Sequence, residues 1–218
     1  MASGFIILLL TTVAILPEVK SIEKVTDPRE FPFIAIINGH PNPVTFGVLV
    51  TSTKVVVSSV HLPERPMSVT IQVGCVFLRN CTTPELSVRL FGEDMVHGII
   101  VLTLFNDTMT IHGRPIPIGL PKIYTNYPCR FVASDWTDGK IYSIEVRTTS
   151  RSKCLQMGVN VPPGYICIVN PMFSGRFDKA GGSSALFCNG RLVGLSNRES
   201  NVNYYVNFMY DVTYPGLL

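Results

Sequence analysis

Residues 179–195 read Lys179-Ala180-Gly181-Gly182-Ser183-Ser184-Ala185-Leu186-Phe187-Cys188-Asn189-Gly190-Arg191-Leu192-Val193-Gly194-Leu195. The first half is a loop of small residues, and the second half contains two short apolar segments. Asn189-Gly190, which separates these segments, is the strongest two-residue turn signal for a β-hairpin. We therefore expect a loop that leads into a hairpin, with strand residues at 186–188 and 192–195.

The remainder of the chain is a series of short apolar segments separated by turn residues, with many Val, Ile, Thr and Tyr positions. This composition favours short strands over long helices. Four prolines between Pro115 and Pro128 indicate a connector between two halves, and the polar segment 22–30 is expected to be irregular. Short strands at this spacing predict an all-β fold, either a pair of barrels or a sandwich. Further strands are expected at 31–37, 44–51, 54–60, 69–73, 86–91, 99–104, 130–134, 141–147, 164–169 and 204–208.

Composition and charge exclude several classes of function. The 218-residue chain is 46% hydrophobic, which is enough for one large core or two small ones. Its formal net charge of +3 is too small to indicate a nucleic-acid partner. The four histidines do not lie at the spacings of metal ligands, so we expect neither a metal nor a cofactor.

Residues 1–21 resemble a secretory signal peptide, because the apolar run from Phe5 to Leu16 is shorter than a membrane span. A positive charge usually precedes such a run and is missing here, which leaves a membrane anchor as the minority alternative. Six cysteines in an exported chain predict disulfides, although six cysteines alone allow fifteen pairings. The sequons that begin at Asn80 and Asn106 predict glycosylation. We therefore expect an extracellular, secreted glycoprotein that has no membrane association once the signal peptide is removed.

The loop and hairpin at 179–195 resemble the nucleophile loop of the trypsin-like (S1) serine proteases, in which Gly-Asp-Ser-Gly-Gly-Pro precedes Leu-Val-Cys-Asn-Gly. The similarity extends from about Phe31 to Tyr210. Segment 31–34 resembles the opening strand of the family, and segment 129–136 resembles its Cys-Leu-Ile-Ser-Gly-Trp with two residues added. The resemblance implies a domain at 22–218 with two six-stranded antiparallel β-barrels and a C-terminal helix shortened to 210–218. The N-terminal barrel is expected at about 32–120 and the C-terminal barrel at about 126–210.

The resemblance also locates the positions of the catalytic groups, and two of these positions lack the required side chain. Counted back from Cys188, the serine position falls on Gly182. Segment 53–62 resembles Trp-Val-Leu-Thr-Ala-Ala-His-Cys and places the histidine on His61. Segment 97–104 resembles Asn-Asp-Ile-Ala-Leu-Leu-Lys-Leu and places the aspartate on Gly98. Acyl transfer by this family needs a nucleophile, a base and an orienting carboxylate, so the resemblance implies a chain that is not an enzyme.

Activation and specificity features of the family are missing as well. No Ile-Val-Gly-Gly start occurs between residues 22 and 33, and the aspartate that would pair with such an amino terminus falls on Gly181. The charged base of the specificity pocket falls on Arg176, and the Trp-Gly of its wall falls on Asn197-Arg198. The scaffold is therefore expected to survive without the parts that bind and cleave a peptide.

The positions of the cysteines relative to the family imply three disulfides, which are Cys129–Cys188, Cys154–Cys167 and, for the two remaining cysteines, Cys75–Cys81. Phe46 and Leu62 stand where the family has the disulfide beside its catalytic histidine. Because that disulfide is lost at both ends, no odd thiol is left.

These observations lead to one main functional hypothesis and two alternatives. The resemblance implies a secreted serine protease homologue of the insect type, a pseudoenzyme that acts by protein–protein binding and modulates proteolysis in body fluid or reproductive secretion. Its expected partner is an active protease or an inhibitor, and neither nucleic acid nor membrane is expected as a partner. The first alternative is a weak or altered serine hydrolase that uses Ser183 with His61. The second is a ligand-binding or storage protein that keeps only the fold.

Overall fold

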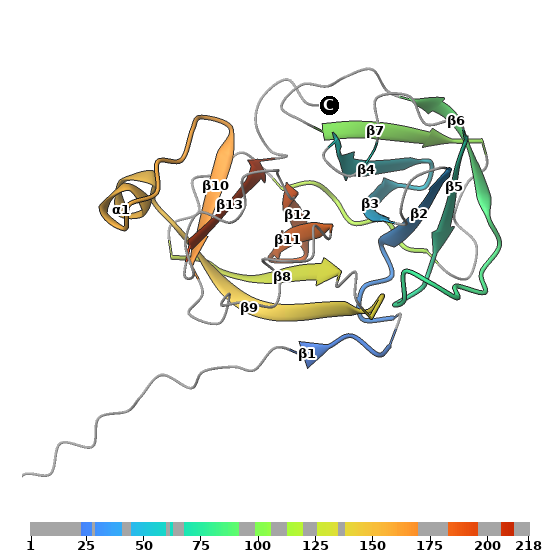
Figure 1. Cartoon of the computed structure of the whole chain (residues 1–218), viewed down its shortest axis with the longest axis horizontal. Helices are drawn as coiled ribbons and strands as arrows, with labels where there is room; N and C mark the ends of the chain where they lie inside the picture. Colours follow the sequence, from blue (N-terminus) through green and yellow to red (C-terminus); the bar gives the residue numbers. More distant parts are fainter. Residues whose placement is uncertain are drawn as a thin grey trace, which may run out of the picture.

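The computed structural model of the chain describes residues 23–27, 29–40, 45–59, 62, 68–91, 99–105, 113–119, 126–134, 138–169, 183–195 and 206–211. Most of these residues belong to strands, which form two neighbouring bodies (Figure 1). The predicted signal at 1–21 lies outside the described residues. The predicted remnant of a C-terminal helix at 210–218 is wrong at its start, because Tyr210 and Asp211 end the strand Val206–Asp211, and 212–218 lie outside the described residues.

The first body is a closed barrel of six antiparallel strands in the order β2-β3-β4-β7-β6-β5. Closure gives every strand a partner on both sides and leaves no free edge. The strands are β2 (Ile34–His40), β3 (Thr45–Thr51), β4 (Lys54–Ser58), β5 (Ser68–Val73), β6 (Leu86–Phe91) and β7 (Ile99–Leu104).

The second body is also a ring of six antiparallel strands, since β8 pairs with β9 and the sheet then continues through β10, β13, β12 and β11 back to β8. The prediction of an all-β fold with two six-stranded barrels is therefore confirmed. The strands are β8 (Pro128–Ser134), β9 (Ile141–Thr149), β10 (Tyr165–Val169), β11 (Ser184–Cys188), β12 (Arg191–Leu195) and β13 (Val206–Asp211).

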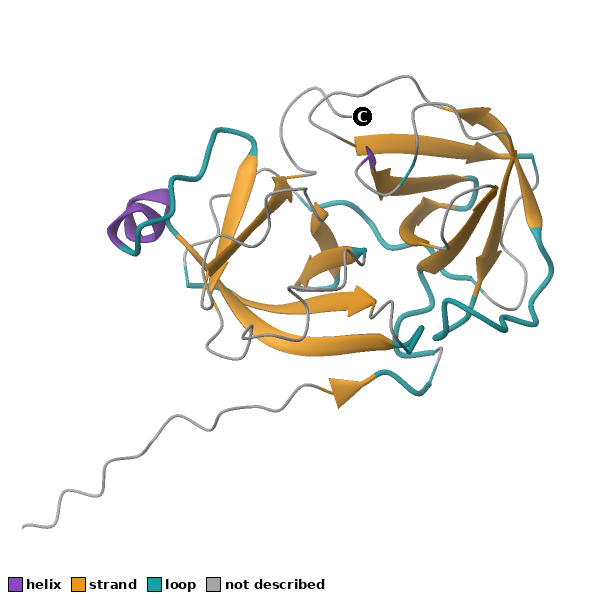
Figure 2. Ribbon diagram, in the orientation of Figure 1, coloured by secondary structure: helices purple, strands orange, loops and turns teal. Residues whose placement is uncertain are grey.

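Helix is scarce in the described part of the chain. Its one α-helix is α1 (Arg151–Gln156), which lies on the outer side of the second barrel (Figure 2). Ser150 caps α1, because its hydroxyl accepts a hydrogen bond from the Lys153 amide at 3.2 Å. Across the described ranges, no helix has the length and apolarity needed to cross a membrane.

Several strands of both barrels are buried on both faces, which is why their sequences are continuously hydrophobic. In β4, for example, Val55 and Val57 belong to the apolar cluster confined to the first barrel, whereas Val56 faces a second cluster that both barrels share. In β8 and β11, Phe131 and Leu186 likewise fill the second barrel, and their neighbours face the shared cluster. Because side chains alternate along a strand, each such strand contributes to two cores.

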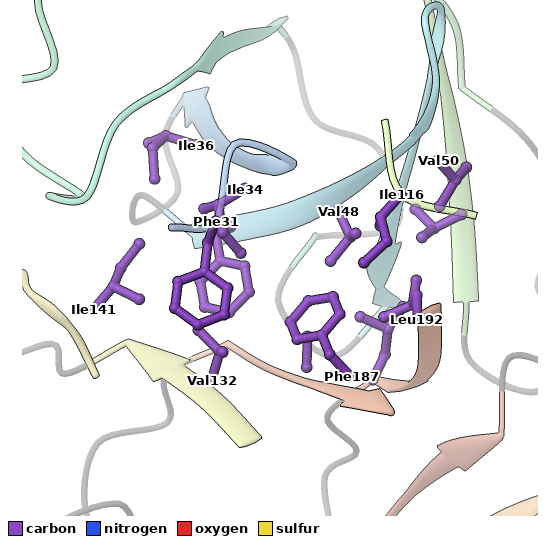
Figure 3. Packing of buried hydrophobic residues seen from close by; sticks show 14 of the residues in the cluster. Phe31, Ile34, Ile36, Val48, Val50, Ile116, Val132, Ile141, Phe187 and Leu192 are labelled. Atoms are coloured by element: carbon purple, nitrogen blue, oxygen red, sulfur yellow. The ribbon is translucent and has the colours of Figure 1, made fainter. Parts of the chain in front are cut away.

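The shared cluster, which we call the inter-barrel core, joins the two barrels (Figure 3). At its centre the Phe33 and Phe187 rings lie 4.7 Å apart, and Phe31 lies 5.8 Å from Phe33 and 6.2 Å from Phe187. Phe187 comes from β11 of the second barrel, whereas Phe31 and Phe33 precede β2 of the first. Aromatic pairs at this separation add to the stability gained by burial.

Part of the predicted connector runs along this core. The Ile116 amide donates to the Leu49 carbonyl of β3 at 3.0 Å, and the Gly119 amide donates to the Leu192 carbonyl of β12 at 2.7 Å. Ile116 is itself 5% exposed. The connector therefore bonds to both barrels in addition to linking them.

The N-terminal segment differs from the prediction, which made residues 22–30 irregular. Glu23–Lys24 form β1, which pairs with β9, and the Val25 amide donates to the Ile141 carbonyl at 2.9 Å. Val25 is 1% exposed and joins the inter-barrel core. Arg130 of β8 holds the segment at two points, since its guanidinium bonds Glu23 at 3.1 Å and Glu30 at 3.0 Å. A two-residue strand carries no periodicity, which is why sequence analysis missed it.

The turn before β9 is closed by a bonded carboxylate. Asp138 accepts from the Tyr142 hydroxyl at 2.5 Å and from the Lys140 amide at 3.0 Å, and the Lys140 ammonium lies 3.2 Å away. Burial alone would raise the pKa of Asp138, but these hydrogen bonds and the Lys140 charge outweigh it and lower the pKa below its ordinary value of 3.8. Gly139 adopts a positive φ of 66° that completes the turn.

We predict that Phe187→Ala lowers the free energy of unfolding by about 3–5 kcal/mol, because it removes the ring that contacts both Phe31 and Phe33 and leaves a cavity. Urea denaturation measures this loss. The matched control is Leu155→Ala, at a side chain 61% exposed, where a loss within about 0.5 kcal/mol is expected. Equal losses for the two variants would contradict the assignment of an inter-barrel core.

We predict that Asp138→Asn destabilises the chain at pH 6 and that its deficit relative to wild type shrinks at pH 3. The folded-state pKa of Asp138 lies below the unfolded-state value, so its stabilisation is present above about pH 4 and is lost as the pH falls through the folded-state pKa. Thermal unfolding of both proteins at the two pH values tests this. A deficit that stays the same at pH 3 would show that the carboxylate's charge is not what matters.

Candidate functional site

The predicted hairpin is present, and a disulfide at the end of its first strand anchors it on the second barrel. β11 and β12 pair across a turn in which Asn189 and Gly190 have φ values of 50° and 66°, as a type I′ turn requires. Cys188, the last residue of β11, is bonded to Cys129 of β8. Residues 183–188 are therefore anchored on the second barrel at both the strand and the disulfide.

Ser183 is the first described residue of this loop, and its side chain is enclosed. The residue is 2% exposed. Its Oγ shares a hydrogen bond with the Thr45 Oγ1 and accepts another from the Phe46 amide at 3.1 Å. Thr45 itself is 1% exposed. The Ser183 hydroxyl thus lies among groups of the first barrel that it satisfies, and it does not face solvent.

The main chain of Ser183 is hydrogen-bonded to the second barrel, whereas its side chain is bonded to the first. Its carbonyl accepts from the Ser134 amide at 2.9 Å and from the Ser134 Oγ at 3.3 Å. Ser134 ends β8, and Ser184 next to Ser183 pairs with Ala133 of the same strand. Ser183 therefore connects β3 of the first barrel with β8 of the second through one residue.

The three vestigial catalytic positions, His61, Gly98 and Gly182, lie outside the described residues, as do Gly181, Arg176, Asn197 and Arg198. Their placement relative to Ser183 is therefore not described, and their assignment remains a prediction. Three neighbours of these positions are described, and all three are buried: Leu62, Ile99 and Ser183 are 6%, 0% and 2% exposed.

The two residues that the resemblance places at the positions of a family disulfide, Phe46 and Leu62, are apolar and buried. Phe46 is 2% exposed and belongs to the inter-barrel core, whereas Leu62 belongs to the cluster inside the first barrel. The two side chains therefore lie in two separate cores. Burial of side chains of this size stabilises by roughly 1.5–3 kcal/mol each.

The six cysteines form the three disulfides that the resemblance implied. Cys129–Cys188 joins neighbouring strands of the second barrel, Cys154–Cys167 joins α1 to β10, and Cys75–Cys81 closes a loop between β5 and β6. Their Cα atoms are 4.4, 6.7 and 5.8 Å apart, respectively.

The other predicted sites give a mixed picture. Asn80 is an exposed residue with a φ of 65°, and Asn106 lies outside the described residues. Use of either sequon remains a prediction. Within the described ranges, no group of three His, Cys, Asp or Glu side chains could hold a metal ion.

Comparison with known proteins identifies the fold. No protein-family model and no curated protein matches the chain. Among solved structures, the scabies mite inactivated protease paralogue S-D1 is similar with a TM-score of 0.70 at 14% identity, over 88% of this chain and 91% of that one. Neuropsin, a serine protease expressed in the limbic system of mouse brain, has a TM-score of 0.66 at 16% identity, over 87% and 93%. The chain has a trypsin-like fold.

The trypsin-like fold confirms the resemblance inferred from the sequence. At 14–16% identity the comparison shows the fold alone, and the insect type remains a prediction. What sequence analysis missed is the role of Thr45, which lies 138 residues from Ser183 along the chain. A threonine at the start of an apolar strand carries no signal for such a contact.

We predict that Ser183→Ala lowers the free energy of unfolding by about 1–3 kcal/mol, because the Thr45 hydroxyl and the Phe46 amide then lose a buried partner. Chemical denaturation measures the change. Ser87→Ala on the exposed face of β6 is the matched control, and a change within about 0.5 kcal/mol is expected there. If Ser183→Ala proved as mild as Ser87→Ala, Ser183 would not be a tie between the barrels.

Proposed function

We propose that this chain is a secreted, non-catalytic trypsin-like protein that acts by binding other proteins. The observation that carries the proposal is the position of the Ser183 hydroxyl, which is buried and hydrogen-bonded to Thr45 and Phe46. Counting back from the disulfide-bonded Cys188 places the nucleophile of the family on Gly182, the residue before Ser183. Glycine has no side chain that could act as a nucleophile.

The environment of Ser183 argues against the alternative of a hydrolase that uses Ser183 with His61. A serine nucleophile needs an approach for the substrate and an adjacent base to accept its proton. Ser183 is 2% exposed, and its oxygen already contacts two groups of β3. Loss of one member of such a catalytic unit costs about 10⁶-fold in rate in a well-studied serine protease, and the family positions here lack two.

Support for secretion and for protein binding comes from the scaffold. Three disulfides in a chain of this size are typical of proteins from oxidising compartments. Surface loops on a rigid β scaffold are the usual place for recognition. We propose an active protease or a protease inhibitor as the partner, so that the chain modulates proteolysis in body fluid or reproductive secretion without cleaving peptides.

The proposal predicts no reaction with a fluorophosphonate probe. The folded chain from residue 22 onward is incubated with the probe beside active trypsin, and labelling is read by mass spectrometry. We expect labelled trypsin and an unlabelled chain, with Ser183→Ala indistinguishable from wild type. Labelling at Ser183 that disappears in Ser183→Ala would establish the hydrolase instead.

Binding is tested separately on the same material. Titration against trypsin-like proteases and their protein inhibitors, followed by size-exclusion chromatography, is expected to give a stoichiometric complex with one of them. A chain that is not labelled by the fluorophosphonate probe and also forms no complex with proteins of its native fluid would support the non-catalytic part of the proposal and refute its protein-binding part.

A further inference from the structure

One of the three disulfides differs from the others in its exposure. Cys75 and Cys81 are only six positions apart and both are partly exposed. The other four cysteines are buried, with exposures of 4%, 1%, 0% and 2% for Cys129, Cys188, Cys154 and Cys167. Thiol–disulfide exchange requires that a thiolate reach a sulfur atom, so the accessible bond is Cys75–Cys81.

The loop that this disulfide closes belongs to the first barrel but packs on the second. Val76 and Leu78 are 6% and 4% exposed and are members of the inter-barrel core. The Leu78 amide donates to the Gly139 carbonyl at 2.8 Å, and Phe77 forms a β-bridge with Lys140. Both partners lie in the turn that precedes β9, so the loop is a contact between the barrels.

The same loop also meets the N-terminal segment. The Lys24 ammonium lies 5.5 Å from the centre of the Phe77 ring, a separation that gives a favourable cation–π contact. Lys24 is part of β1, which pairs with β9. The disulfide loop, the turn at 138–140 and β1 therefore form one contiguous contact region, which we call the clasp.

The disulfide determines the shape of the loop on its own barrel. The Gln72 side-chain amide donates to the carbonyls of Cys81 at 3.2 Å and Thr83 at 2.7 Å, and it accepts from Asn38 at 3.0 Å. Gln72 thus anchors the distal side of the loop. The segment that contacts the second barrel, 76–78, is connected to this anchor through the Cys75–Cys81 bond.

Without the bond, the link between β5 and β6 becomes an open connection of twelve residues, 74–85. Ordering a loop in one conformation costs conformational entropy. The disulfide reduces this cost because it already restricts the loop in the unfolded chain. Among the described residues, segment 76–78 is then held against the turn by the Leu78–Gly139 hydrogen bond and the Phe77–Lys140 bridge. Opening of the bond is therefore expected to loosen the clasp while both barrels stay closed, since neither barrel's strand pairing includes Cys75 or Cys81.

We propose that Cys75–Cys81 is a selectively reducible bond that controls the clasp between the two barrels. The reductant is a dithiol. One of its thiolates attacks a sulfur of the bond and displaces the other cysteine as a thiolate, and its second thiolate then resolves the mixed disulfide. The protein gains two protons and two electrons and holds two thiols, while the dithiol becomes a cyclic disulfide. The proposal is independent of whether the chain has catalytic activity.

The first experiment measures selectivity on the folded, oxidised chain. Dithiothreitol is added in graded amounts without denaturant, free thiols are alkylated with iodoacetamide, and peptides are quantified by mass spectrometry. Because the other four sulfurs become accessible only through local opening, we expect Cys75 and Cys81 to be alkylated at least about tenfold faster than Cys154, Cys167, Cys129 and Cys188. Equal rates for all six cysteines would overturn the proposal.

The second experiment measures the clasp by amide hydrogen exchange. In the selectively reduced protein, the amides of Leu78 and Val25, which bond Gly139 and Ile141, are expected to exchange at least about tenfold faster. The amides of β4 and β7 are the internal control and should keep their protection. Cys75→Ser/Cys81→Ser provides the same state without reductant, and the reduced wild type carries the test if that variant does not fold. Unchanged exchange at Leu78 and Val25 after selective reduction would refute the control of the clasp.

Discussion

The inter-barrel core is the constraint on which the rest of this structure depends. Strands such as β4 present Val55 and Val57 to their own barrel and Val56 to the neighbouring one, so neither barrel can bury its apolar surface alone. The Phe33–Phe187 contact at 4.7 Å marks the centre of this arrangement. Continuous apolar sequence, which in a solitary antiparallel sheet would expose hydrophobic surface, is therefore a requirement here.

Ser183 shows how the same constraint bears on the candidate site. Its hydroxyl satisfies Thr45 and the Phe46 amide, and its carbonyl accepts from Ser134, so one small residue connects polar groups at the boundary of two barrels. Buried polar groups need partners, and these partners come from opposite barrels. In the proposed non-catalytic protein, the loop that would have carried a nucleophile contributes to stability instead.

Sequence reasoning reached the fold because its signals are local. Asn189-Gly190 dictates a hairpin through its backbone preferences, and the apolar runs at Ile34–Ile37 and Val55–Val57 indicate buried strands. The disulfide pairing followed only from the resemblance. Contacts between distant residues carried no such signal: Thr45 with Ser183, and Arg130 with Glu23, are pairs whose members are more than a hundred residues apart. β1 was missed because two residues cannot show a period.

The docking of β1 has a consequence for how the chain is made. Glu23 pairs with Ser143, so the first strand to leave the ribosome must wait for the synthesis of 120 further residues (143 − 23) before its partner exists. At the 5–20 residues per second typical of translation, that interval is on the order of ten seconds. Throughout it, Val25 and Phe31, both buried in the finished protein, have no complete core to enter. The burial of this N-terminal segment is thus completed only late in the synthesis of the chain.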